Sequence, residues 1–166
     1  QGQFVWLDKV TIRNLELLHS SNAGAKTLID VIDKTSSPMG SRLMRRWLSL
    51  PLKNKEQINA RYDIVDYFVN NNDLIYKFQD AIRQVGDLER LISKVSLLRV
   101  NPRELLQLAR ALDQIEIIKN LCADSNDDSI KLYAEQLNVC DSIRQKIKRV
   151  LNPDSPALIS KGNFIN

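Results

Sequence analysis

Apolar residues recur at intervals of three and four over most of this 166-residue chain, a spacing that places them along one side of an α-helix. The clearest helix start is Ser37, which can cap a helix whose first residue is Pro38. We expect this helix to end near Pro51 and to carry an apolar row at Leu43, Trp47 and Leu50.

A second helix is predicted to start after Asn54, which makes a candidate capping box with Gln57. Apolar side chains spaced four, three and four residues apart predict one buried face on it, formed by Ile58, Tyr62, Val65 and Val69. The polar residues 70–73 end this helix, and a shorter helix is expected over 74–84.

Gly86 then interrupts the pattern, and Asp87 can cap a helix with an apolar row at Leu88, Leu91, Val95 and Leu98. The strongest helix start in the sequence is Asn101-Pro102-x-Glu104, with a capping residue, Pro at the first position and Glu at the third. We expect this helix to run to about Cys122. Its apolar residues cover so wide an arc that it should pack on more than one side.

Two further helices are predicted over 129–137 and 142–151. Short apolar runs at 4–7 and 15–18 are candidates for a strand pair, and residues 157–159 and 164–165 are candidates for a second pair. The predicted fold class is therefore mainly α, a helical array with short β pieces at its N-terminal and C-terminal ends.

Composition supports this class. Five glycines and five prolines are about half the usual share of roughly 12%, so the tight turns of a sandwich or barrel are scarce. At 166 residues we expect one domain. Cys122 and Cys140 are too far apart for a zinc knuckle or a redox pair and are expected to be free thiols. No run approaches 18 apolar residues, and both ends look like cuts in a longer chain.

Catalytic and metal-binding motifs are largely missing from the sequence. His19 is the only histidine, and we expect it to be structural or merely exposed. Lys26-Thr27 lacks both glycines of a phosphate-binding loop. Asp30 and Asp33 come without a metal or sugar motif and are expected on a solvated face. We therefore expect no enzyme activity, no metal and no cofactor in this segment by itself.

Two clusters of basic residues are the remaining candidates for a binding surface, in a chain whose net charge is +4. Residues 35–61 hold six basic side chains against one acidic, with Arg42, Arg45 and Arg46 at the centre. Residues 141–151 hold four basic side chains, including Lys148 and Arg149, against one acidic side chain. Contact with DNA phosphates is one interpretation. The other interpretation is that these residues form a solvated helix face or inter-domain salt bridges, and we favour this second interpretation.

Several ordered motifs resemble the core, or lever, domain of the MutS family of mismatch-recognition ATPases. The match begins with residues 7–8, 11–17 and 27–35. Its most specific part is Thr35-Ser36-Ser37-Pro38-Met39-Gly40-Ser41-Arg42-Leu43-Met44-Arg45-Arg46-Trp47-Leu48, followed by Pro51-Leu52. Residues 83–91 and 102–105 follow in the family's order, so the resemblance covers about 4–165.

The resemblance implies that residues 1–166 are a fragment of this core domain, cut before the DNA clamp insertion. The mismatch-binding, clamp and ATPase domains would lie elsewhere in a cytoplasmic bacterial protein that binds ATP and Mg. Mismatched double-stranded DNA, a second copy of the parent and other repair proteins would be its partners, with no membrane involved. None of the family's catalytic or base-reading motifs occurs in this chain.

The helical segment would then act as a lever that couples ATP state to DNA clamping. Pro38, Gly40, Gly86 and Pro102 would mark where helices enter and turn. Two alternatives remain open at this stage: a helical module that binds DNA directly and non-specifically, and an unrelated scaffold for protein partners.

Overall fold

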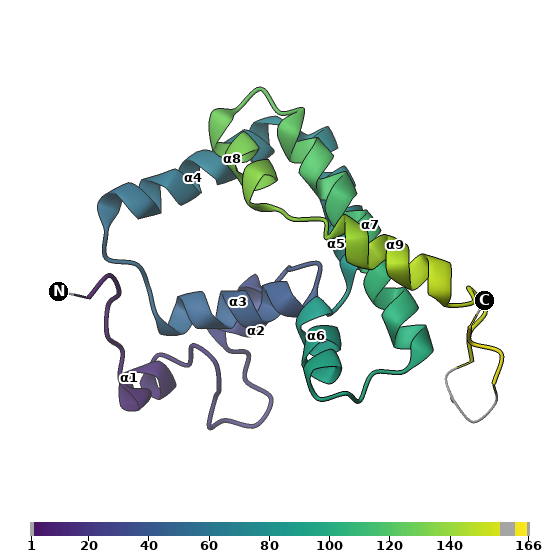
Figure 1. The fold of residues 1–166 in the computed structure, drawn as a ribbon. Helices are drawn as coiled ribbons and strands as arrows, with labels where there is room; N and C mark the ends of the chain where they lie inside the picture. The colour runs from purple at the N-terminus through teal and green to yellow at the C-terminus, as the bar shows by residue number, and fades with distance from the viewer. Residues whose placement is uncertain (1, 157–161, 166) are drawn as a thin grey trace. The chain divides into compact units, whose positions relative to one another are not determined.

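The computed structural model describes residues 2–156 and 162–165, and its regular structure is helical, as predicted (Figure 1). The chain divides into two compact units, Gln1–Asn72 and Asp73–Asn166, which are described separately below. The expected strand at 157–159 lies outside the described residues.

The first unit contains α1 (Lys9–Asn14), α2 (Leu28–Ile32), α3 (Pro38–Ser49) and α4 (Lys55–Asn70). The predicted starts of α3 and α4 are confirmed. The hydroxyl of Ser37 accepts a hydrogen bond from the Gly40 amide at 3.1 Å, and the side chain of Asn54 accepts one from the Gln57 amide at 2.8 Å. Each side chain satisfies an amide that has no partner within its own helix.

The predicted pairing of residues 4–7 with 15–18 is wrong. The residues between these two runs form a short helix, α1, instead of a turn. Asp8 caps the start of this helix by accepting a hydrogen bond from the Thr11 amide at 2.6 Å. Residue Phe4 instead makes an isolated antiparallel bridge with Leu52, in the connection between α3 and α4. Backbone hydrogen bonds from Val5 to Pro51 and from Lys53 to Gln3 flank this bridge, at 2.8 and 3.0 Å.

The predicted buried face of α4 is also wrong for this structure. Tyr62, Val65 and Val69 are 66%, 58% and 60% exposed, although their spacing is that of a packed helix. Periodicity identifies the side of a helix that is apolar, but it does not supply the neighbour that would cover that side.

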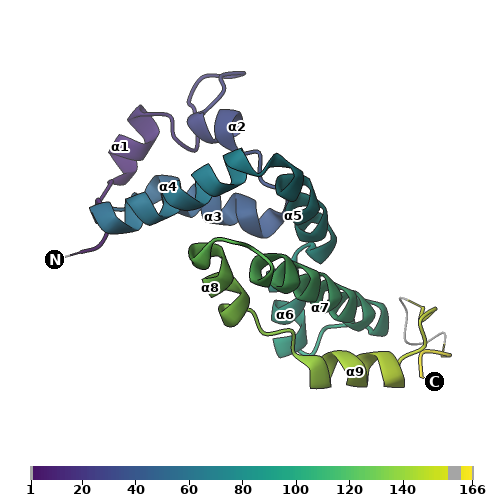
Figure 2. The same ribbon diagram turned by 90° about the horizontal axis from the view of Figure 1, so that it is seen from above.

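The second unit is built around α7 (Pro102–Ala123), whose 22 residues span about 33 Å at 1.5 Å per residue. The predicted capping box is confirmed, because Asn101 accepts from the Glu104 amide at 2.9 Å while Glu104 accepts from the Asn101 amide at 3.1 Å. Packing on more than one side is confirmed as well. The helices α6 (Leu88–Ser96), α8 (Asp128–Gln136) and α9 (Asp141–Val150) all contact α7 (Figure 2).

The helix α7 contributes more buried apolar side chains to this unit than any other helix. They are joined by residues of α6, α8 and α5 (Asn72–Val85), and together the buried apolar side chains of these helices are Phe78, Ala81, Val85, Leu91, Leu106, Ala109, Ala111, Leu112, Cys122, Ile130 and Ala134. Cys122 and Cys140 are both free, and burial raises the pKa of the Cys122 thiol.

The helix α6 starts at the predicted cap, Asp87, but ends before the last residue of its predicted apolar row. Leu98 has φ 53° and is 91% exposed. Its amide donates to the Val95 carbonyl at 2.9 Å, and the Arg99 amide donates to the Lys94 carbonyl at 2.9 Å. These two bonds form a Schellman helix ending, which turns Leu98 away from the helix face that Leu91 occupies.

Near the C-terminal end, Leu151 makes an isolated antiparallel bridge with Ile165, so the described β structure consists of two such bridges. Over the described ranges, no helix has both the length and the apolar character needed to cross a membrane.

Candidate functional site

The three arginines proposed as contacts in the first basic cluster lie on α3. Arg42, Arg45 and Arg46 are all exposed, and their spacing of three and one puts them on neighbouring positions of one side of the helix. This is the arrangement a cationic surface requires, and each side chain extends from a helix whose start is fixed by Ser37 and Pro38.

Two carboxylates of the adjoining segment lie near this surface. Asp33 accepts from the Ser41 hydroxyl at 2.5 Å and from the Thr35 hydroxyl at 2.6 Å, and these hydrogen bonds lower the pKa of its carboxyl, with a further contribution from the charge of Arg45. Hydrogen bonds from Thr27 similarly lower the pKa of Asp30. Asp30 is exposed and Asp33 is half-buried, and both carboxylates also hold turns around α2 through hydrogen bonds to neighbouring amides.

Arg61, on α4, packs on an aromatic ring of α3. Its guanidinium carbon lies 3.6 Å from the centroid of the Trp47 ring on α3. A guanidinium stacked at this distance forms a cation–π contact, which fixes the position of the side chain. Arg61 therefore ties α3 to α4.

The second basic cluster is divided between two sides of α9. On the side facing α7, Arg144 is 6% exposed and donates to Glu116, and it also donates to Asp141 at 2.5 Å. Its Nη1 atom is 3.4 Å from Asp113. Lys148 lies one turn further along and places its Nζ 2.6 Å from the same Asp113 carboxylate. We call these five side chains the α7–α9 ion cluster.

The charges in this cluster stabilise one another. The hydrogen bond from Arg144 lowers the pKa of Glu116, and the same bond raises the pKa of Arg144. The Nε atom of Arg144 is buried and has no hydrogen-bond partner among the described residues. Buried guanidinium groups need carboxylate partners because desolvation is costly, and three carboxylates converge on this one.

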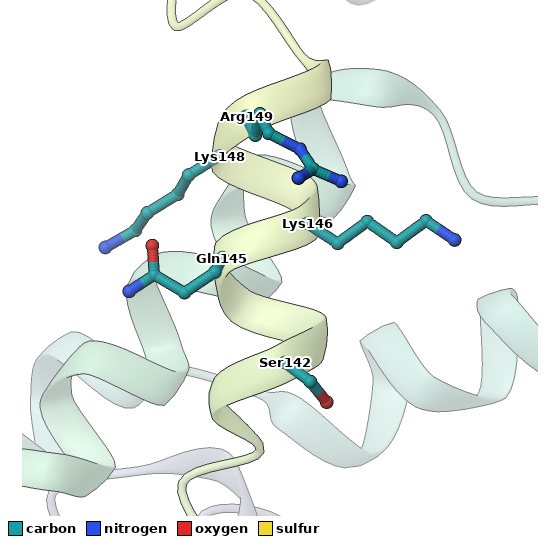
Figure 3. Close-up of a pocket in the computed structure, with 5 residues that line it drawn as sticks. All are labelled: Ser142, Gln145, Lys146, Lys148 and Arg149. Atoms are coloured by element: carbon teal, nitrogen blue, oxygen red, sulfur yellow. The ribbon is translucent and has the colours of Figure 1, made fainter.

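The other side of α9 faces solvent. A hollow of about 660 Å³ is lined there by Ser142, Gln145, Lys146, Lys148 and Arg149. Figure 3 shows Lys146 and Lys148 extending to opposite sides of the helix, with Ser142 near its start and Arg149 near its end. The two proposed contact residues of this cluster both line the hollow, but Lys148 also reaches Asp113 on α7 and so belongs to the ion cluster as well.

Arg144 belongs to the basic run at 141–151, but no motif in the sequence distinguishes it from the other basic residues of that run. The signal that identifies it is the pair Asp113 and Glu116, which are three residues apart and so share a side of the long apolar helix α7. Two acids on a helix expected to pack on several sides need a cationic partner, and Arg144 supplies it.

The four junction residues lie where helices begin or end. Pro38 and Pro102 are the first residues of α3 and α7, and Gly86 separates α5 from α6 with φ 68°. A Cβ atom on Gly40 would lie 3.0 Å from the Cβ of Thr35, so this position in α3 has little room for a side chain. Within the described ranges, no group of three or more His, Cys, Asp or Glu side chains is placed to hold a metal ion.

Comparison with known proteins identifies the family. The model of MutS domain III matches residues 10–166. DNA mismatch repair protein MutS of Flavobacterium psychrophilum is 50% identical over 165 residues, which is 99% of this chain and 19% of that protein. The corresponding proteins of Flavobacterium johnsoniae and Bacteroides fragilis are 50% and 47% identical over the same share. The chain spans about a fifth of these curated relatives, and it belongs to the MutS domain III family.

Proposed function

We propose that this chain is the core, or lever, segment of a MutS-type mismatch-recognition ATPase and couples ATP state to the clamping of mismatched DNA. Membership of the domain III family is the observation that carries the proposal. The remainder of the proposal follows from the same resemblance: a cytoplasmic parent that binds ATP and Mg outside this chain, forms a homodimer, and acts with other repair proteins on mismatched double-stranded DNA.

The packing of the second unit supports a transmitting role. A displacement passes through a protein when packed elements move as one body. Here α7 contacts three other helices, and the α7–α9 ion cluster joins side chains that are 28 and 35 residues apart in sequence. A helix fixed on several sides moves together with its neighbours, which is what a lever requires.

The test uses a full-length protein that carries this segment, with Arg144→Gln to weaken the ion cluster and Lys146→Gln as the control on the exposed side of α9. The rate at which ATP addition releases a mismatched duplex measures the coupling. We expect Arg144→Gln to slow ATP-driven release while ATP hydrolysis without DNA and mismatch affinity without ATP stay near their original values. Faster exchange of the α9 amide hydrogens would show that Arg144→Gln loosens this helix. If release of the duplex were then unchanged, the coupling role would be refuted.

Direct contact with DNA through α3 is a second candidate, favoured by the exposure of Arg42, Arg45 and Arg46 on neighbouring positions. Anisotropy titration of the chain against matched and single-mismatch duplexes at two salt concentrations tests it. Salt-dependent binding without mismatch preference, lost in the triple Gln variant, supports this candidate. Negligible binding at moderate salt assigns DNA contact to other parts of the parent.

A further inference from the structure

A groove runs over the second unit between α7 and the segment that follows α9. It consists of two adjoining hollows of about 420 Å³ and about 360 Å³, which share Leu106, Arg110 and Pro153. Ala109 and Leu151 add to the apolar floor of the second hollow, whereas Arg103 and Asp154 lie in the first. We call this feature the Arg103–Arg110 groove.

The two arginines of the groove are placed regularly on α7. Residues 103, 106 and 110 are three and four apart, so they share one side of the helix, with Leu106 between the two cations. Seven residues of helix separate the arginine Cα atoms by about 10.5 Å along the axis. A ligand that reaches both must therefore carry two acceptors about two helical turns apart.

The charge of these arginines is not compensated within the described structure. Arg103 and Arg110 are exposed and form no hydrogen bond or ion pair with another described residue. Two nearby charged residues do have partners, because the Nζ atom of Lys148 lies 2.6 Å from a carboxylate oxygen of Asp113 and the two charges neutralise each other. Among the described residues that line the first hollow, Asp154 is the single acid beside the two arginines, so these residues carry an excess of positive charge.

We propose that the Arg103–Arg110 groove binds an acidic amphipathic helix of a partner protein. Carboxylates at positions i and i+7 of that helix would lie opposite Arg110 and Arg103, and an apolar side chain at i+3 or i+4 would cover Leu106 and Pro153. Arginine is suited to this contact because its planar guanidinium donates two parallel hydrogen bonds to one carboxylate. This inference does not depend on the coupling role.

The apolar floor decides between a peptide and a nucleic acid as the occupant. A phosphate backbone would neutralise the arginines but would offer no apolar group to the second hollow, where Pro153 is exposed above the largely buried Leu106 and Leu151. A helix with acidic and apolar side chains on one face satisfies both parts of the groove, as in other helix-in-groove complexes. The arginines lie at an exposed rim, so binding should be sensitive to salt.

The test is fluorescence anisotropy of the chain with labelled peptides of about 15 residues, long enough for about four helical turns. The first peptide carries Glu at i and i+7 and Leu at i+3 and i+4 in a helix-forming background. A second has the same composition with the Leu residues moved to the opposite face, a third has Lys in place of Glu, and a matched DNA duplex is the fourth probe.

We expect saturable binding of the first peptide that weakens about tenfold in Arg103→Gln/Arg110→Gln and in high salt, as for exposed charge pairs. Arg99→Gln is the control, since Arg99 is exposed, precedes α7 and does not line the groove. The Leu-shifted and Lys peptides should bind weakly or not at all. Circular dichroism establishes that each variant keeps its helix content, and Arg103→Lys/Arg110→Lys, which preserves charge, should retain part of the affinity.

Three results would overturn the proposal. One is the absence of saturable binding by the first peptide, and another is binding that the arginine substitutions leave unchanged. The third is binding of the duplex, but not of the peptide, that is lost in the arginine variant, which would make the groove a nucleic-acid surface instead.

Discussion

Lys148 on α9 places its ammonium group 2.6 and 2.7 Å from the two carboxylate oxygens of Asp113, which lies 35 residues earlier on α7. Its neighbour in the cluster, Arg144, makes its contacts in a far less exposed position. The two cations hold the same pair of helices together in different surroundings, so their removal should have unequal effects.

Lys148→Gln should lower the free energy of unfolding by about 0–1 kcal/mol, as is usual for an exposed ion pair. Arg144→Gln should cost more, because it leaves three carboxylates close together without their shared cation. Urea unfolding followed by circular dichroism measures both. Equal losses in the two variants would show that the buried position of Arg144 adds nothing.

Acid should weaken the ion cluster through Glu116. The hydrogen bond from Arg144 lowers the pKa of this carboxyl below its ordinary value of 4.5. A group whose pKa is lower in the folded state stabilises the fold above its unfolded pKa and loses that contribution as pH falls through its folded pKa. The melting temperature should therefore decline as pH drops below about 4.5, and Glu116→Gln should make that decline shallower. An identical pH profile for this variant would contradict the expectation.

Gly86→Val should destabilise the junction between α5 and α6. The φ angle of 68° is open to glycine, whereas an ordinary residue there costs about 1–2 kcal/mol and a β-branched one more. No atom lies within 4 Å of an added Cβ, so the expected loss comes from the backbone and not from a clash. Gly86→Asn is the matched control, since Asn adopts this conformation more readily. Thermal melting should show a larger loss of stability for Gly86→Val than for Gly86→Asn.

Leu98→Gly should leave the stability unchanged or raise it by up to about 1 kcal/mol, although it removes a large apolar side chain. Leu98 is 91% exposed, so little burial is lost, and its positive φ is relieved by glycine at a helix ending that favours this residue. The gain is offset in part by the greater freedom of glycine in the unfolded chain. A clear loss of stability in urea unfolding would mean that Leu98 packs on something in solution.

The parts of the fold that the sequence predicted correctly are those with local causes. Helix starts at Ser37, Asn54, Asp87 and Asn101 depend on a side chain and an amide three residues later, which a short stretch of sequence contains. The bridge between Phe4 and Leu52 joins residues far apart in the chain, and no local pattern indicates it.

The candidate surfaces show the same limit. The basic residues of α9 were visible in the sequence, but their division between a side facing α7 and a side facing solvent depends on how α9 packs. The exposure of Tyr62 and Val65 likewise depends on which elements are present to cover α4. Whether Arg42, Arg45 and Arg46 touch DNA stays a prediction.

The pairing of residues 3–5 with 51–53 also has a mechanical consequence. Three consecutive residues near the start of the chain pair with the loop between α3 and α4. A pulling force applied to the start of the chain therefore enters the first unit at that loop. The helices α1, α2 and α3 all lie in the stretch of chain that this pairing closes, so they are bypassed while the two backbone hydrogen bonds hold. The short β contact thus passes force from the start of the chain directly to the beginning of α4.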